Sequence, residues 1–253
     1  MYLKVRGLLS AAWPRIFRGI RVSLSHHEER QTPPAHIGRV AELFTDGNLS
    51  FSGTRHHIII SGTGRAGTTF LVQLLTQLGL DTGFADPFSH IFANCNAGME
   101  WDMRHPGAPY VLKDPWLCDY LSDALQEGGI CIDHAIIPVR DLFSAAESRR
   151  DVTQRTDLEP YQGNIQHVPG GLWHTEKPEQ QEAVLAQQLY KLIYTLAQHE
   201  IPLTLLHFPR FIHDPSYLHG QLGFMLPVMS YTSFLEAFHT VVQPELVHEF
   251  KPN

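Results

Sequence analysis

Short apolar runs alternate along this sequence with segments in which apolar residues recur every three or four positions. Four of the runs predict strands buried in a sheet. These runs lie at residues 57–60, 110–112, 130–139 and 203–208. The periodic segments predict helices. These segments lie at residues 68–78, 118–127, 141–150 and 182–199. Alternating strands and helices predict an α/β fold with three layers around a mostly parallel sheet.

A glycine-rich turn joins the first predicted strand to the first predicted helix, within HIIISGTGRAGTTFLVQLL at residues 57–75. Gly62, Gly64 and Gly67 allow backbone angles that wrap an anion, and Thr68 and Thr69 place hydroxyl groups where the helix begins. The free N–H groups of the first helical turn and the positive end of the helix dipole favour a bound phosphate or sulfate. The stretch predicts a P-loop-like anion-binding turn; the alternative is a turn that serves packing alone.

One position of this turn departs from the nucleotide-binding pattern G-x-x-x-x-G-K-[ST]. Gly62, Gly67 and Thr69 match, whereas Thr68 replaces the lysine and the cation is Arg65. The variant T-G-R-A-G-T-T-F resembles the 5′-phosphosulfate loop of sulfotransferases. The resemblance implies that the donor 3′-phosphoadenosine 5′-phosphosulfate (PAPS) binds here, with Arg65 at the phosphosulfate. The implied donor-binding residues of this loop are Gly64, Arg65, Ala66, Gly67, Thr68, Thr69 and Phe70.

The second predicted strand leads into Lys113. The carboxyl ends of parallel strands face the ligand crevice, so Lys113 is expected beside the glycine-rich turn. The segment L-K-D-P-W-L resembles the K-D-P segment of bacterial sulfotransferases, which implies a catalytic role for Lys113. Many members of the family carry a catalytic histidine two residues after this lysine, where the present chain has Pro115. In the alternative interpretation, Lys113 is a solvated charge and Asp114 begins a helix.

The third predicted strand is followed by Arg140, and Ser148 lies eight residues further on in the next predicted helix. A guanidinium group offers a bidentate fork to phosphate, and a helical serine adds a hydroxyl donor. Sulfotransferases keep an arginine and a serine at this spacing, and the resemblance implies that both contact the 3′-phosphate of PAPS. The alternative is a strand-ending arginine that pairs with Asp141.

Residues 85–108 form a long irregular segment rich in Asn, Gly, Pro and acidic residues. Long irregular loops often carry functional sites. Because Pro115 excludes the histidine mechanism, a carboxylate is the preferred general base. The candidates, in order of preference, are Asp86, Glu100, Asp114 and then His90. Asp86 comes first because its loop follows the first helix and can turn back over the crevice; each of these side chains can also be a solvated loop residue.

The composition is that of an ordinary globular protein of 253 residues, with 43% hydrophobic and 18% charged residues. The net charge of −7 argues against a nucleic-acid binder, which needs a basic face. An anionic cofactor must therefore be held by local cations. Three cysteines without a C-x-x-C pair, and histidine pairs without metal-ligand spacing, predict neither a disulfide framework nor a metal site. A reducing, cytoplasmic location is expected.

The chain is divided into an N-terminal extension at residues 1–53 and an α/β domain at residues 54–253. The first 30 residues are basic and amphipathic, and Pro14 interrupts any single helix. They lack the run of about 18 apolar residues that crosses a bilayer. Two interpretations stay open: peripheral contact with an anionic membrane surface, or helices packed on the domain with a solvated basic face.

These features together predict a sulfotransferase that moves a sulfuryl group from PAPS to an acceptor hydroxyl or amine of a small molecule or carbohydrate, without a metal. The C-terminal R-K-G-x-x-G-D-W type motif of the family is absent, so the mode of adenine binding is open. One alternative is a P-loop kinase or nucleoside triphosphatase, which predicts a lysine before Thr69. Another is a non-catalytic nucleotide-binding scaffold. The acceptor and the oligomeric state are not predicted.

Overall fold

The computed structural model describes residues 53–161, 163–165 and 168–250. The basic amphipathic segment and its predicted membrane contact lie outside these residues. Within the described part of the chain, no helix has both the length and the apolar character needed to cross a membrane.

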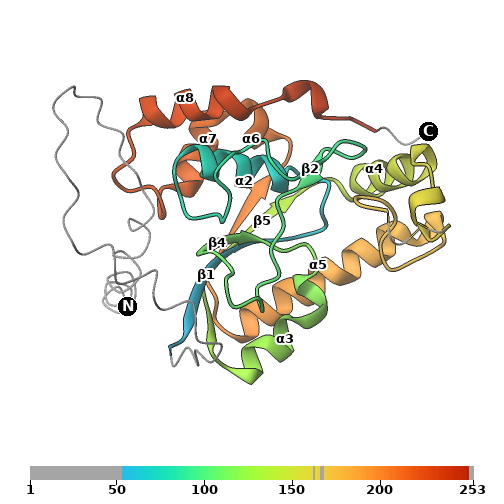
Figure 1. Cartoon of the computed structure of the whole chain (residues 1–253), viewed down its shortest axis with the longest axis horizontal. Helices are drawn as coiled ribbons and strands as arrows, with labels where there is room; N and C mark the ends of the chain where they lie inside the picture. Colours follow the sequence, from blue (N-terminus) through green and yellow to red (C-terminus); the bar gives the residue numbers. More distant parts are fainter. Residues whose placement is uncertain (1–52, 162, 166–167, 251–253) are drawn as a thin grey trace, which may run out of the picture.

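Four parallel strands form the central sheet, in the order β4-β1-β5-β6 (Figure 1). Their bounds are Arg55–Ile60 for β1, Val111–Lys113 for β4, Ile130–Val139 for β5 and Leu203–His207 for β6. β1 lies between β4 and β5, and both of its faces are covered, so Ile58, Ile59 and Ile60 are at most 2% exposed. The sheet confirms the predicted α/β class and all four predicted strands.

Helices cover both faces of the sheet and complete the three layers (Figure 1). On one face lie α2 (Thr68–Gln77), α6 (Arg210–His213), α7 (Pro215–Leu222) and α8 (Tyr231–Val241), and on the other lie α3 (Leu117–Glu127), α4 (Leu142–Arg155) and α5 (Gln181–Gln198). The apolar core of the first face contains Ile58 and Ile60, and the core of the second face contains Ile59. This division arises because successive side chains of a strand point to opposite faces.

Two segments differ from the sequence-based expectation. The helix predicted at residues 141–150 continues to Arg155 as α4, with the Asp141 carboxylate capping its start by accepting from the backbone N–H of Ser144. The irregular segment 85–108 contains a small antiparallel hairpin, β2 (Ile91–Phe92) and β3 (Ala97–Gly98). Strands of two residues are too short to produce an alternating pattern, so the sequence gives no signal for them.

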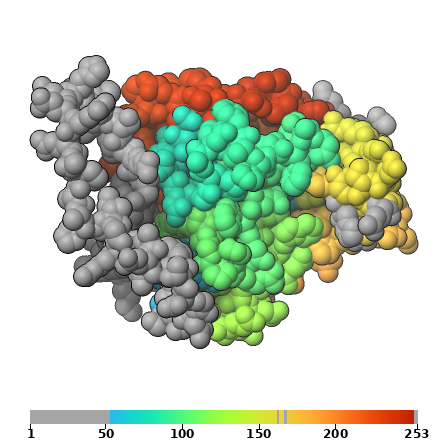
Figure 2. Space-filling view, in the orientation of Figure 1, coloured from blue at the N-terminus to red at the C-terminus, as the bar shows by residue number. Residues whose placement is uncertain are grey.

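Short 3-10 turns complete the described elements, at Glu159–Tyr161, Pro178–Gln180 and Pro244–Leu246. The last of these follows α8 because Pro244 cannot continue a hydrogen-bonded helix. The hairpin and its flanking loops lie on the face of the molecule shown in Figure 2, between α8 in red and α4 in yellow. The carboxyl ends of β1, β4 and β5 lie beneath this loop layer, where the candidate site is found.

Candidate functional site

The turn between β1 and α2 has the backbone shape of an anion cradle. Gly62, Gly64 and Gly67 have positive φ angles of 139°, 65° and 78°, and Arg65 also has a positive φ, of 54°. Gly67 is the N-cap of α2, and no side chain caps the first turn of the helix. The N–H groups at this helix start are therefore directed toward the site, where the helix dipole favours an anion.

Two of these glycines are also required by close packing. A Cβ atom on Gly64 would lie 2.6 Å from Nη2 of Arg149, and a Cβ on Gly67 would lie 2.8 Å from Cζ of Phe211. A Cβ atom does not come this close to another heavy atom unless one of them is displaced. The cradle therefore packs tightly against the Phe211 ring and the buried Arg149 guanidinium group.

Arg65 extends from the cradle into a half-buried position between α4 and the hairpin. Its Nε donates to Oγ of Ser148 at 3.0 Å, and its Nη1 donates to the backbone oxygen of Cys95. Burial lowers the pKa of Arg65 from its usual value, because removal from water disfavours the charged form. The structure thus brings together Arg65 and Ser148, which lie 83 positions apart in sequence.

Arg140 follows β5 and lies next to Arg65. Its Nη1 donates to the backbone oxygen of Arg65 at 2.7 Å, and its Nη2 donates to the backbone oxygen of His248. Its guanidinium carbon lies 5.1 Å from the ring centre of Phe208. Burial, with a smaller contribution from the charge of Arg65, lowers the pKa of Arg140 to about 10. The alternative interpretation, in which Arg140 pairs with Asp141, is not seen among the described ion pairs, and the Asp141 carboxylate caps α4 instead.

These residues line a first cavity of about 150 Å³. Its floor is the start of α2, and its far wall is the segment from Val241 to His248, which the sequence did not single out. Ser144, one turn before Ser148 on α4, donates to the backbone oxygen of Phe250, which lies two residues beyond this segment. The predicted donor-binding residues that line this cavity are Arg65, Gly67, Thr68, Thr69, Phe70, Arg140 and Ser148.

Lys113 is the last residue of β4 and is only 3% exposed. Its Nζ donates to Oγ1 of Thr69 at 2.9 Å and to the backbone oxygen of Gly98 at 2.8 Å, and it lies 3.1 Å from Oε1 of Glu100. Burial lowers the pKa of Lys113, while the charge of Glu100 acts in the opposite direction. The alternative interpretation of Lys113 as a solvated strand-end charge is therefore wrong.

A second cavity, of about 420 Å³, opens on the other side of the cradle. Glu100 and Lys113 lie on its wall together with Arg149, and its remaining wall is largely apolar, including Trp116 and Trp173. The two indole rings meet edge to face at 5.5 Å. The second cavity shares three lining residues with the first, namely Arg65, Thr68 and Ala97. The two cavities therefore meet at the cradle.

The structure separates the candidate general bases. Glu100 lines the second cavity and is about one-third exposed, at 36%. Asp86 and His90 line neither cavity. The Asp86 carboxylate accepts from the backbone N–H of Phe88 at 2.9 Å, and the His90 ring packs against Phe84 at 5.3 Å. The preference for Asp86 as the leading base is not supported by this placement, because its exposed side chain lines neither cavity.

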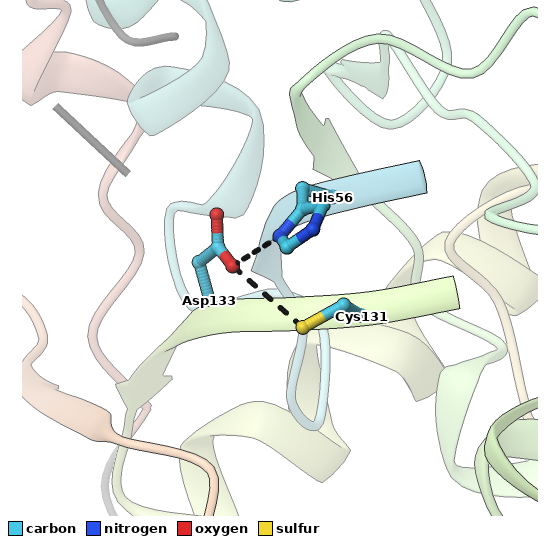
Figure 3. Close-up of side chains that lie close together, drawn as sticks. All are labelled: His56, Cys131 and Asp133. Atoms are coloured by element: carbon cyan, nitrogen blue, oxygen red, sulfur yellow. Dashed lines mark hydrogen bonds and ion pairs between the residues drawn. The ribbon is translucent and has the colours of Figure 1, made fainter. Parts of the chain in front are cut away.

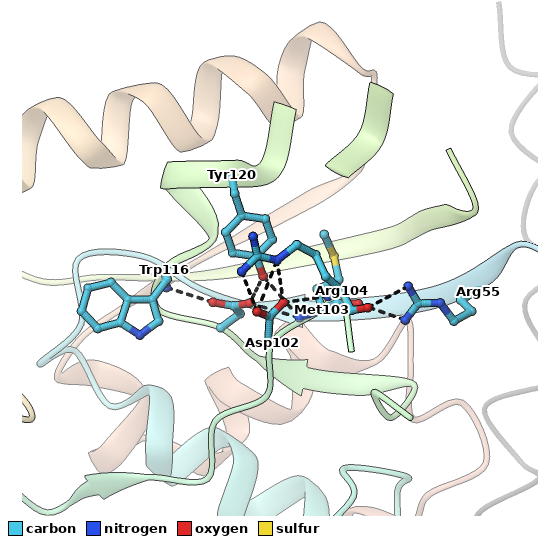
Figure 4. Close-up of polar contacts among 7 residues, drawn as sticks. Arg55, Asp102, Met103, Arg104, Trp116 and Tyr120 are labelled. Atoms are coloured by element: carbon cyan, nitrogen blue, oxygen red, sulfur yellow. Dashed lines mark hydrogen bonds and ion pairs between the residues drawn. The ribbon is translucent and has the colours of Figure 1, made fainter. Parts of the chain in front are cut away.

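Asp114 is buried, and its three hydrogen-bond partners, Met103, Trp116 and Tyr120, are labelled in Figure 4. Its carboxylate accepts from the Tyr120 hydroxyl, from the backbone N–H of Met103 at 3.2 Å and from the backbone N–H of Trp116 at 2.9 Å. Burial raises its pKa. Asp114 lines neither cavity, so its position favours a structural role: its carboxylate holds the turn before α3, whose N-cap is Trp116, and anchors the loop at Met103.

Arg149 is a residue of the site that the sequence analysis missed. It is 7% exposed, and its two Nη atoms donate at 2.7 Å to the backbone oxygens of Gly171 and Thr63. Its guanidinium carbon lies 5.0 Å from the ring centre of Trp173. Burial, and then the charge of Arg65, lowers its pKa to about 9. The only available signal was its position directly after Ser148, on the helix that faces the cradle.

Comparison with known proteins adds a structural likeness. No family model matches the sequence, and no curated protein matches it. Among solved structures, the protein is similar to the "Sulfotransferase Domain from the Curacin Biosynthetic Pathway", with 14% sequence identity and a TM-score of 0.45. The likeness covers 74% of this chain and 78% of that domain. At this level of similarity, function has to be argued from the residues of the site itself.

Replacement of Gly67 by alanine tests the packing of the cradle. Gly67 and Gly79 have nearly the same φ, 78° and 80°, but only Gly67 has atoms close to the added methyl group. Both substitutions incur the backbone penalty, whereas Gly67→Ala also overpacks Phe211, which typically costs about 1–3 kcal/mol more. Urea unfolding of the two variants measures the difference. Equal losses would show that the close contact with Phe211 relaxes without cost.

Proposed function

We propose that this protein is a PAPS-dependent sulfotransferase that transfers a sulfuryl group to a hydroxyl or amine of a small molecule or carbohydrate. The observation that carries the proposal is the local charge. Among the described residues that line the two cavities, five are cationic and only Glu100 is a carboxylate. The cations are Arg65, Lys113, Arg140, Arg149 and Arg155. A protein of net charge −7 concentrates positive charge here, which suits a ligand with several negative charges.

The first cavity suits the nucleotide part of the donor. In this proposal, the start of α2 with Thr68 and Thr69 binds the 5′-phosphosulfate, and Arg140 and Ser148, which line the same cavity, bind the 3′-phosphate. The guanidinium groups of Arg65 and Arg140 donate to backbone oxygens in this structure. A charged phosphate oxygen accepts a stronger hydrogen bond than a backbone carbonyl does, so a bound phosphate can replace these partners. The first cavity holds about 150 Å³, less than the ~300 Å³ at the lower end of small-molecule sites, and we infer that the segment after α8 moves when a nucleotide enters.

The second cavity suits the acceptor. An acceptor hydroxyl beside Glu100 faces the cradle at Arg65 and Thr68, where the two cavities meet. Glu100 takes the hydroxyl proton as the acceptor oxygen bonds to sulfur and the bond from sulfur to the phosphate oxygen breaks. Negative charge then develops on the departing phosphate oxygen. Lys113, Arg65 and the threonine hydroxyls stabilise it, and one preorganised donor of this kind typically contributes about 3 kcal/mol.

A P-loop kinase or nucleoside triphosphatase is less consistent with the site. Thr68 occupies the position of the phosphate-binding lysine. Arg140 follows β5, at the place where such enzymes carry the acidic residue that holds magnesium. A non-catalytic scaffold shares the same donor site, and only measurements of transfer separate it from an enzyme.

Ligand-dependent stability tests the donor site. Adenosine 3′,5′-bisphosphate should raise the melting temperature, with a stabilisation of about 2.7 kcal/mol at 100 times its Kd, whereas ATP with magnesium should give little. Arg140→Gln should remove most of the preference for the bisphosphate over adenosine 5′-monophosphate, which lacks the 3′-phosphate. Arg210→Gln, at an exposed arginine paired with Asp214, is the matched control. Stabilisation by ATP and magnesium alone would favour the kinase class.

Transfer of labelled sulfate from PAPS to a panel of hydroxyl and amine acceptors tests the general base. Glu100→Gln should lower kcat by about 10²–10⁴ and leave bisphosphate binding unchanged, because a positioned base contributes that range. Asp86→Asn should retain nearly full activity. A larger decrease of kcat in Asp86→Asn than in Glu100→Gln would identify Asp86, and not Glu100, as the general base. Bisphosphate binding without transfer to any acceptor would favour the scaffold.

A further inference from the structure

Three side chains with different metal-ligating atoms meet at the end of the sheet opposite the cradle (Figure 3). His56 lies near the start of β1, and Cys131 and Asp133 lie near the start of β5. Nδ1 of His56 and Oδ1 of Asp133 are 2.7 Å apart, and Sγ of Cys131 is 3.8 Å from the same oxygen. The three ligand atoms all lie within 4.8 Å of one another. The proposed transferase chemistry uses none of these residues.

The backbone brings the three residues together through an irregularity of the sheet. His56 is directly paired with Cys131, and His57 with Ile132, but the next pair is Ile58 with His134. Asp133 is therefore an extra residue of β5 at a β-bulge, and bulges between parallel strands are rare. Bulges commonly redirect a side chain, and this one places the Asp133 carboxylate against His56, on the side where Cys131 lies.

The Asp133 carboxylate is also held from its other side. The Tyr110 hydroxyl donates to Oδ2 of Asp133 at 2.9 Å, which leaves Oδ1 directed toward His56 and Cys131. Ligating carboxylates in metal sites are commonly oriented by such a second hydrogen bond. The His56 and Asp133 side chains are 27% and 17% exposed, so an ion from solvent can reach the group while most of its surface is enclosed.

We propose that His56, Cys131 and Asp133 bind a zinc-class transition-metal ion, with a fourth position open to water or another ligand. An imidazole nitrogen, a thiolate and a carboxylate together suit zinc and its congeners, whereas magnesium and calcium prefer oxygen ligands alone. Zinc bonds of about 2.0–2.3 Å place tetrahedral ligand atoms about 3.4 Å apart. The thiol is already near that separation from Asp133. Binding of the ion displaces the proton of the His56–Asp133 hydrogen bond from Nδ1 of His56 and the proton of the Cys131 thiol, and both are taken up by solvent.

Cobalt(II) is the probe, because a cobalt–thiolate bond produces a charge-transfer band in the near ultraviolet. The full chain, stripped with a chelator, should bind one equivalent of cobalt with this band, and zinc should abolish the band by competition. Cys131→Ser should lose the band, and His56→Gln and Asp133→Asn should each weaken binding at least tenfold. Cys118→Ser, at a buried thiol on α3, should retain the band.

Tyr110→Phe separates a metal site from an ordinary histidine–aspartate hydrogen bond. It leaves all three ligands in place and should weaken cobalt binding about 10–100-fold, as other losses of ligand orientation do. Far-ultraviolet circular dichroism and melting temperature in metal-free buffer confirm that each variant is folded. Absence of the band in the unmodified chain would overturn the proposal. Survival of the band in Cys131→Ser would also overturn it, because the metal would then be bound by another thiol.

Discussion

Positive charge that exceeds the nearby carboxylates is the constraint on which the site depends. Lys113 and Arg149 are buried, and Arg65 and Arg140 are half-buried between the cradle, α4 and the surrounding loops. Of these four cations, Lys113 alone pairs with a carboxylate, that of Glu100. A buried cation is costly unless its N–H groups are satisfied. Backbone oxygens supply most of the partners here, and they belong to Cys95, Gly98, Thr63, Gly171, Arg65 and His248.

This arrangement explains why segments without regular structure pack around the cradle. The hairpin is attached by Arg65 and Lys113, and the loop at residues 168–173 is attached by Arg149. The segment after α8 is attached by Arg140. In each of these attachments the acceptor is a neutral carbonyl group. An anion of the right shape would accept stronger hydrogen bonds from the same cations, because its oxygen atoms carry negative charge. The same cations can thus serve the architecture before binding and the ligand afterwards.

The sequence predicted the features that arise from contiguous residues. The apolar run before Gly62 and the periodic residues after Gly67 define the strand, turn and helix of the cradle, and the residues that end β4 and β5 follow from the runs that precede them. Helical spacing also placed Ser148 on α4. These predictions succeeded because burial on both faces of a parallel sheet leaves a strong apolar signal.

Features that depend on contacts between distant segments could not be read in the same way. Glu100 and Asp86 look equivalent in sequence, and only the path of the hairpin turns Glu100 toward Lys113 while Asp86 faces outward. Arg149 needs Gly171 and Thr63, which come from two separate loops. His56 appeared to lack metal-ligand spacing because its neighbours in space lie on β5, and the bulge that presents Asp133 exists only in the pairing of two strands.

The segment after α8 is held through its own carbonyl groups. Arg140 donates to the backbone oxygen of His248 and Ser144 donates to that of Phe250, so these two hydrogen bonds do not depend on the identity of the side chains there. On the proposed function, occupancy of the first cavity and release of this segment are linked equilibria, because the nucleotide competes with the peptide backbone for the same guanidinium group. The susceptibility of this segment to limited proteolysis should therefore rise as the cavity fills, so cleavage near the C-terminal end of the described chain would report loading without a chromophore or a labelled ligand.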